Sequence, residues 1–390
     1  MILINLLPYI SIFLISNFFL KKKLVFGNNS TRSYNIFFLV VILCTFAGMR
    51  SINVGTDTIH YINKYVQAIS YNSLNTYVKE IYNGRDYLFA IMTFLVAKIT
   101  GANQFIYLFL CQLFAIWPLV LAMKKMKTYV PLNAAFIFYY VLYFPIGFNT
   151  IREVIAGSFL ILALMYYYSA EYKKCIVMAI IAQLFHHATI LAIVVMVIVE
   201  AIIIIKNKKI RRVIITLTIA VIIICAINYT TVLRYLFADG SLFSGTKIAS
   251  YYNRYTSGTL KTYLVTMDKY GQREIIFREI FFILTLGLSK NIDVKYLGLT
   301  GQKDYYFTKR FRIYSIVSIL IYTIIFFGTS STYGYRITYI IDLINIFYYG
   351  HILMRSKSQI KYVLLILLVA YYYLIYIQIR AHGIFPYHIA

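Results

Sequence analysis

The stretch FPIGFNTIREVIAGSFLILALMYYYSAEYKKCIVMAIIAQLFHHAT, residues 144–189, decides the fold. It contains two apolar runs that are separated by a pair of lysines, with Arg152 before the first run and His186 and His187 after the second. If both apolar runs cross the membrane and the lysine pair between them lies on the cytoplasmic side, the chain returns to the side from which it started. Ionisable residues at the ends of apolar spans are costly and usually functional. We therefore expect Arg152 and the histidines to lie on one shared face.

The composition excludes a soluble globular protein. Of the 390 residues, 61% are hydrophobic and 13% are charged, whereas soluble domains carry about 25% charged residues. A net charge of +25 would suggest nucleic acid in a soluble protein. In an apolar chain it fits cytoplasmic loops and anionic lipid or phosphate instead, so we predict membrane lipid and no nucleic acid as partner.

Repeated apolar runs predict an all-α, polytopic transmembrane helical bundle of about 12–13 membrane segments. We expect a single integral membrane domain over residues 1–390, with one long extracytoplasmic loop at 230–273. Lysine- and arginine-rich loops can all lie on the cytoplasmic side if the apolar run 87–99 is re-entrant or interfacial. The outward loops then carry the candidate site residues.

The first outward candidate is the turn after the second apolar run. It holds Arg50, Asp57 and Tyr61 around a glycine hinge. Asp57 is a candidate acid or base, and Tyr61 is a candidate sugar contact. A snorkelling anchor at Arg50 and a helix N-cap at Asp57 are the alternatives.

The second candidate begins the run 154–169. Asn149 precedes a helix start whose first turn contains Arg152. A guanidinium beside the positive end of a helix dipole suits a diphosphate, and Asn149 suits a sugar hydroxyl. The alternative is that Glu153 neutralises Arg152 at the membrane interface.

Two adjacent histidines at a helix break cannot both face the same way, so we expect His186 or His187 to be functional. A neutral imidazole can deprotonate a sugar hydroxyl. Neither a metal-binding spacing nor a carboxylate cluster accompanies them, and we predict no metal or other cofactor.

The remaining candidates lie in two other outward segments. In the loop 230–273, Arg254 would pair with phosphate, and Tyr251 and Tyr255 would stack on sugars; headgroup-level anchoring is the alternative reading. Arg336 starts a late apolar span. Anchoring can explain one outward arginine, but several of them suggest an anionic ligand.

Several of these motifs together resemble one known family. They are Arg50 with VGTDTIHY at 54–61, NTIREVIA at 149–156, the histidine after the next span, Arg336 with Tyr339, and Pro386-Tyr387. In this order they are similar to the EpsG/Wzy-like polysaccharide polymerases.

The resemblance implies a glycosyltransferase of the bacterial cytoplasmic membrane. It would polymerise capsule, exopolysaccharide or O-antigen repeat units carried on undecaprenyl diphosphate, with other polysaccharide assembly proteins as possible partners. In that reaction His186, His187 or Asp57 would act as base, and Arg50, Arg152 and Arg336 would hold the diphosphate. A lipid-linked oligosaccharide flippase, a membrane acyltransferase and a non-catalytic assembly partner are the rival readings.

Overall fold

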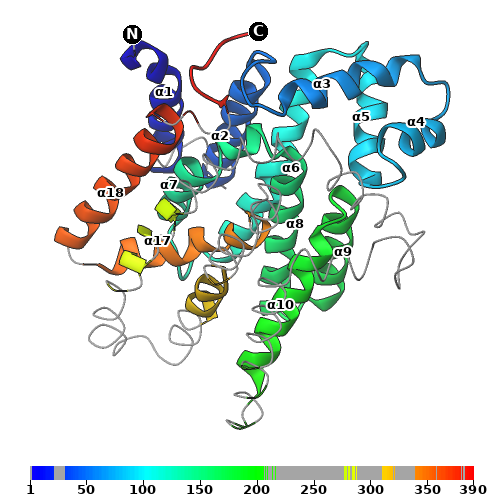
Figure 1. Cartoon of the computed structure of the whole chain (residues 1–390). Helices are drawn as coiled ribbons and strands as arrows, with labels where there is room; N and C mark the ends of the chain where they lie inside the picture. Colours follow the sequence, from blue (N-terminus) through cyan, green and yellow to red (C-terminus); the bar gives the residue numbers. More distant parts are fainter. Residues whose placement is uncertain are drawn as a thin grey trace.

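The computed structural model describes residues 2–21, 31–205, 339–356, 358–378 and 383–390, with residue 380 and scattered positions in 207–216, 276–287 and 310–320. Within these residues the chain is a bundle of helices (Figure 1). The helices are α1 (Ile2–Lys21), α2 (Thr31–Gly48), α3 (Thr58–Gln67), α4 (Leu74–Ile81), α5 (Tyr87–Thr100), α6 (Gln104–Lys125), α7 (Leu132–Leu142), α8 (Ile151–Tyr168), α9 (Tyr172–Phe185), α10 (Thr189–Ile204), α17 (Asn345–Arg355) and α18 (Ser358–Tyr372).

This architecture confirms the predicted all-α membrane bundle. Three described segments are long and apolar enough to cross a membrane, namely Gln104–Lys125, Ile151–Tyr168 and Ser358–Gln378. Shorter apolar helices accompany them. Helices suit this setting because each satisfies its own backbone hydrogen bonds in lipid. The predicted number of segments and the loop at 230–273 depend on residues outside those described.

The centre of the bundle is α8, which packs against α6 and α9. Its Gly157 faces residues 339–344 closely enough that an added Cβ would lie 3.2 Å from the Cα of Ile340. Small residues permit such close approach between membrane helices. The chain between 339 and 355 is helical apart from a turn at 343–344.

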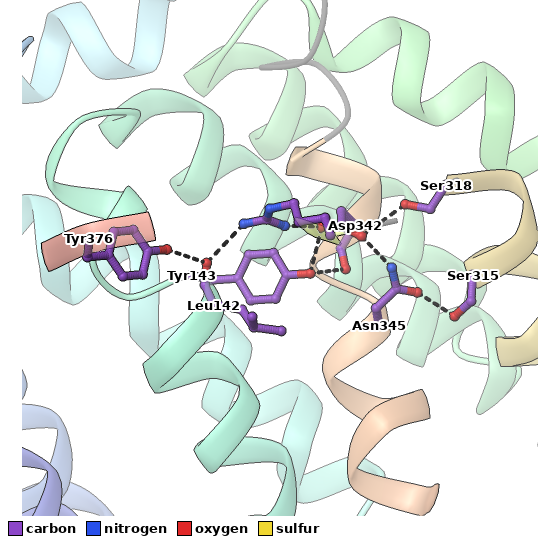
Figure 2. A network of polar contacts seen from close by, with 8 residues as sticks. Leu142, Tyr143, Ser315, Ser318, Asp342, Asn345 and Tyr376 are labelled. Atoms are coloured by element: carbon purple, nitrogen blue, oxygen red, sulfur yellow. Dashed lines mark hydrogen bonds and ion pairs between the residues drawn. The ribbon is translucent and has the colours of Figure 1, made fainter. Parts of the chain in front are cut away.

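A buried polar network lies at this turn (Figure 2). Asp342, 5% exposed, accepts hydrogen bonds from Tyr143 Oη at 2.8 Å and from Ser318 Oγ at 3.0 Å. Arg278 pairs with the same carboxylate, and Asn345 donates to it. The network therefore joins the end of α7 to the start of α17 and to helical residues near 278 and 318.

Helices α3, α4 and α5 pack together at one end of the bundle (Figure 1), and α5 also packs against α6 and α9. At the start of α5, Asp86 contacts His187 at the end of α9. At its other end, Thr100 Oγ1 lies 2.6 Å from Tyr65 Oη in α3, and the adjacent Gln104 donates to the backbone oxygen of Arg50. Both ends of α5 thus lie at the end of the bundle where α2 and α9 finish. The re-entrant or interfacial placement of this run remains a prediction.

Candidate functional site

Asp86 is the centre of the site, although the sequence analysis did not select it. It follows a tight loop in which Asn83, Gly84 and Asp86 have φ of 52°, 63° and 50°. Two of these are non-glycine residues in the left-handed region, where a side chain is disfavoured. Such strain persists only where surrounding contacts fix it, and it is common at functional sites. Here the loop brings a carboxylate, 4% exposed, to the ends of α8 and α9.

The Asp86 carboxylate joins the predicted arginine to a predicted histidine. Oδ2 forms an ion pair with Arg152 Nη1. Oδ1 accepts hydrogen bonds from the backbone N and the ring Nδ1 of His187, both at 2.8 Å. His186 Nδ1 lies 3.6 Å from the same oxygen. The prediction that Arg152 and the histidines share one face is correct, and one carboxylate unites them.

The two histidines differ in exposure, although both rings lie beside Asp86 Oδ1, which corrects the expectation that they face different ways. The backbone becomes extended at His186, with φ of −148° and ψ of 116°, which ends α9. The His186 side chain is 9% exposed and its Nδ1 has no hydrogen-bond partner. The His187 side chain is 42% exposed and is held by Asp86. His187 is therefore the histidine that a substrate can reach.

Arg152 lies in the first turn of α8, as the sequence predicted. Its side chain is 23% exposed and its Cζ lies 5.6 Å from the centre of the Tyr61 ring. Tyr61, 5% exposed, thus packs against the guanidinium. Lys64, one turn along α3 and half-buried, packs over the ring of Tyr82 at 4.9 Å. Arg152 and Lys64 therefore lie at this end of the bundle with the N-terminus of α8 and the carboxyl groups of Asp86 and Glu153.

Asn149 braces the glycine turn that carries Asp57. Its Oδ1 accepts hydrogen bonds from Thr56 Oγ1 at 2.8 Å and from the backbone N of Asp57 at 2.6 Å. Asn149 is 2% exposed. Gly55, with φ of 95°, lets this turn pass close to Phe148. The structure therefore joins the two sequence motifs directly, and the predicted sugar contact of Asn149 remains a prediction.

Arg50 is enclosed rather than presented at the surface. It is 1% exposed, its Cζ lies 4.4 Å from the centre of the Phe148 ring, and its Nη1 donates to the backbone oxygen of Ala47 at 2.7 Å. Residues 383–390 cover it, with backbone hydrogen bonds of 2.7–2.9 Å to residues 49–55. Of the predicted diphosphate-binding arginines that the structure describes, Arg152 alone is partly exposed. Arg254, Arg336, Tyr251 and Tyr255 lie outside the described residues.

Burial raises the pKa of Asp86, but the contacts with the two histidines and the charge of Arg152 outweigh burial. They hold the pKa of this carboxyl well below its usual range. Asp86 is therefore ionised throughout the physiological pH range. An ionised carboxylate at hydrogen-bond distance from His187 Nδ1 favours the tautomer with the proton on Nδ1.

Among the described residues, one group could hold a metal ion: the ligand atoms of Asp86, His186 and His187 lie within 4.8 Å of one another. However, Oδ1 of Asp86 already accepts two N–H groups from His187, and Oδ2 pairs with Arg152. A backbone N–H cannot ligate a metal, so this geometry suits a hydrogen-bonded carboxylate better than a metal ligand.

Comparison with known proteins gives one family. No curated protein matches the chain, and no solved structure matches it. The family model described as EpsG family matches residues 33–389. The match includes the turn at Asp57, the loop at Asp86, the helix start at Arg152 and the histidine pair. The chain therefore belongs to the EpsG family, a family of Wzy-like polymerases, as its motifs predicted.

Proposed function

We propose that the protein joins oligosaccharide repeat units into a cell-surface polysaccharide on the outer face of the bacterial cytoplasmic membrane. Both units would be carried on undecaprenyl diphosphate. A hydroxyl oxygen of the incoming unit forms a bond to the anomeric carbon of the growing chain. The bond from that carbon to the diphosphate oxygen breaks, and the hydroxyl proton passes to a base.

One observation carries this proposal: Arg152 and His187 meet at Asp86, at the end of the bundle predicted to face outward. In the proposed reaction, Arg152 binds the departing diphosphate, aided by the positive end of the α8 helix dipole. A donor placed where negative charge develops typically contributes on the order of 10²–10³-fold in rate.

His187 is the proposed base. It is the exposed histidine, and its Nδ1 is engaged by a carboxylate. General base catalysis contributes roughly 10²–10⁴-fold. The proton taken by Nε2 then leaves to solvent once the lipid diphosphate departs. His186 and Asp57 are left with supporting roles in this proposal, because His186 is buried and the backbone at Asp57 is braced by Asn149.

The test is polymer ladder analysis in a deletion strain that carries wild type or single variants at equal membrane levels. We expect Arg152→Ala and His187→Ala to lose long chains and to accumulate single lipid-linked units outside. Arg152→Lys should rescue poorly, because a point charge cannot replace a bidentate fork. His186→Ala should have the smaller effect of the two histidine variants.

Lys125→Ala is the matched control. Lys125 also pairs with a carboxylate, Glu171, but at the far end of α6. Its ladder should equal that of wild type. Unchanged ladders from both Arg152→Ala and His187→Ala would contradict the proposal. Single lipid-linked units retained inside the cell would indicate a flippase instead.

A further inference from the structure

The role of Asp86 goes beyond what the family match provides. This residue is held in the left-handed region with φ of 50° and ψ of 45°, and its carboxylate is almost fully buried. Its two oxygens are divided between two partners, one cationic and one imidazole. A buried carboxylate that served only to neutralise Arg152 would not need the second pair of contacts.

We infer that Asp86 is the positioning residue of the reaction, which holds His187 as base and fixes its place relative to Arg152. The inference rests on the proposed function. Asp86 does not touch the reacting atoms; it acts through its two partners.

Asp86 holds His187 at two atoms. Backbone N and ring Nδ1 of this residue both donate to Oδ1 at 2.8 Å. Two donors from one residue to one oxygen fix both the position of the backbone and the rotation of the ring. With Nδ1–H engaged, Nε2 is the nitrogen that can accept a proton. Carboxylate contacts of this kind orient imidazoles in many catalytic and metal sites.

Asp86 also sets the spacing between the proposed base, His187, and the proposed diphosphate-binding residue, Arg152. Because Oδ1 holds His187 and Oδ2 holds Arg152, one planar carboxylate sets the distance between the two groups. In the proposed reaction this spacing helps to set where the attacking hydroxyl, at His187, lies relative to the departing diphosphate, at Arg152. Displacement of either group by about 1 Å can cost on the order of 10²-fold in rate.

The groups around Asp86 and His187 support the same arrangement. Charged groups that face Asp86 come from α8 (Arg152), α3 (Lys64) and the histidine pair. Gln183 Nε2 donates to the backbone oxygen of His187 at 2.9 Å and supports the same turn from α9. Asp86 thus holds the ring of His187 and Gln183 holds its backbone, while 42% of the side chain remains exposed.

The test is a double-mutant cycle on the purified full-length protein in lipid nanodiscs, with an undecaprenyl-diphosphate-linked oligosaccharide as substrate. The variants are Asp86→Asn, His187→Gln and the double variant, and kcat and KM are measured for each. We expect Asp86→Asn to lower kcat by roughly 10²-fold, with a smaller change in KM. In the His187→Gln background, Asp86→Asn should lower kcat by clearly less than in wild type, because residues that act as a unit are non-additive. The part that remains reflects the contact of Asp86 with Arg152.

Two further variants keep the result interpretable. Asp86→Glu retains a carboxylate but moves it by one methylene, so it should fold, keep KM and still lose kcat. Glu171→Gln, which removes a carboxylate from a distant ion pair, should leave kcat and KM at wild-type values.

Each contrary outcome is distinct. If Asp86→Asn costs as much in the His187→Gln background as in wild type, the positioning role is wrong while the base can stand. If His187→Gln keeps the wild-type kcat, both the base and its positioning are wrong. If the purified protein binds one divalent metal ion per chain and Asp86→Asn loses it, Asp86 is a ligand rather than a positioning residue.

Discussion

The network in Figure 2 permits a quantitative prediction for Asp342→Ala. Removal of this carboxylate leaves Arg278, 8% exposed, buried without its counter-charge. Loss of one partner of a buried ion pair costs about 3–5 kcal/mol. The hydroxyl of Ser318 and the amide of Asn345 also lose this acceptor, at about 0.6 kcal/mol each between membrane helices. Tyr143 Oη keeps the backbone oxygen of residue 342 as acceptor, at 2.7 Å. We expect a loss of about 5 kcal/mol in the free energy of unfolding.

The assay is SDS titration of the purified protein in mixed micelles, followed by circular dichroism. Asp342→Ala should unfold at a much lower SDS fraction than wild type. The paired variant Arg278→Met/Asp342→Leu removes both charges and should recover most of the loss, because apolar residues of similar size often replace a buried ion pair without cost. Equal stability of Asp342→Ala and wild type would refute the reasoning. So would a paired variant no more stable than Asp342→Ala.

Three more outcomes are expected. Gly55→Ala should lower membrane abundance more than Gly101→Ala: both glycines have positive φ, but an added Cβ at 55 would lie 2.9 Å from a backbone carbonyl, whereas position 101 is open. Gly157→Leu should separate α8 from the helix of Ile340 and reduce the thermal stability of the detergent-solubilised protein by several degrees or more. The stability advantage of wild type over Asp86→Asn should not shrink as the pH falls from 8 to 5. A carboxyl with a depressed folded-state pKa stabilises above its unfolded value of about 3.9 and loses that stabilisation only at lower pH; a difference that shrinks between pH 8 and pH 5 would contradict this.

Local sequence features were sufficient for much of the fold and part of the site. Apolar run length predicted the helical bundle, and the lysine pair between α8 and α9 correctly placed Arg152 on the same face as the histidines. The helix break at His186-His187 was also correct. The expectation that the two rings face different ways was wrong, because both Nδ1 atoms lie beside Asp86 Oδ1 and the ring centres are 5.1 Å apart. The correct predictions depend on two helices that are neighbours in the chain, so they could be made from local sequence alone.

The central carboxylate could not be chosen in this way. Asp57 and Asp86 both precede helices and both resemble N-caps, and the sequence analysis selected Asp57. The contact between Asp86 and His187 joins residues 101 positions apart, and it depends on how α3 and α4 fold. The one local signal is the sequence NGRD at 83–86, which favours a left-handed turn but does not indicate what the turn faces.

The burial of Arg50 was likewise unpredictable, because its cover comes from residues 383–390. An arginine at the outward end of a span resembles an accessible anion site, and only the packed tail shows otherwise.

That tail has a consequence for the order in which the protein acquires its structure. Tyr9 Oη donates to the backbone oxygen of Ile384, 375 positions away, and residues 49–55 pair with 383–390. Contacts between such distant residues form late, because the loop between them must close first. The contacts that residues 383–390 make with the glycine turn therefore form only after most of the helices have been inserted and packed. An incompletely folded chain would leave this turn unbraced on one side, so the geometry of the site is a measure of complete assembly.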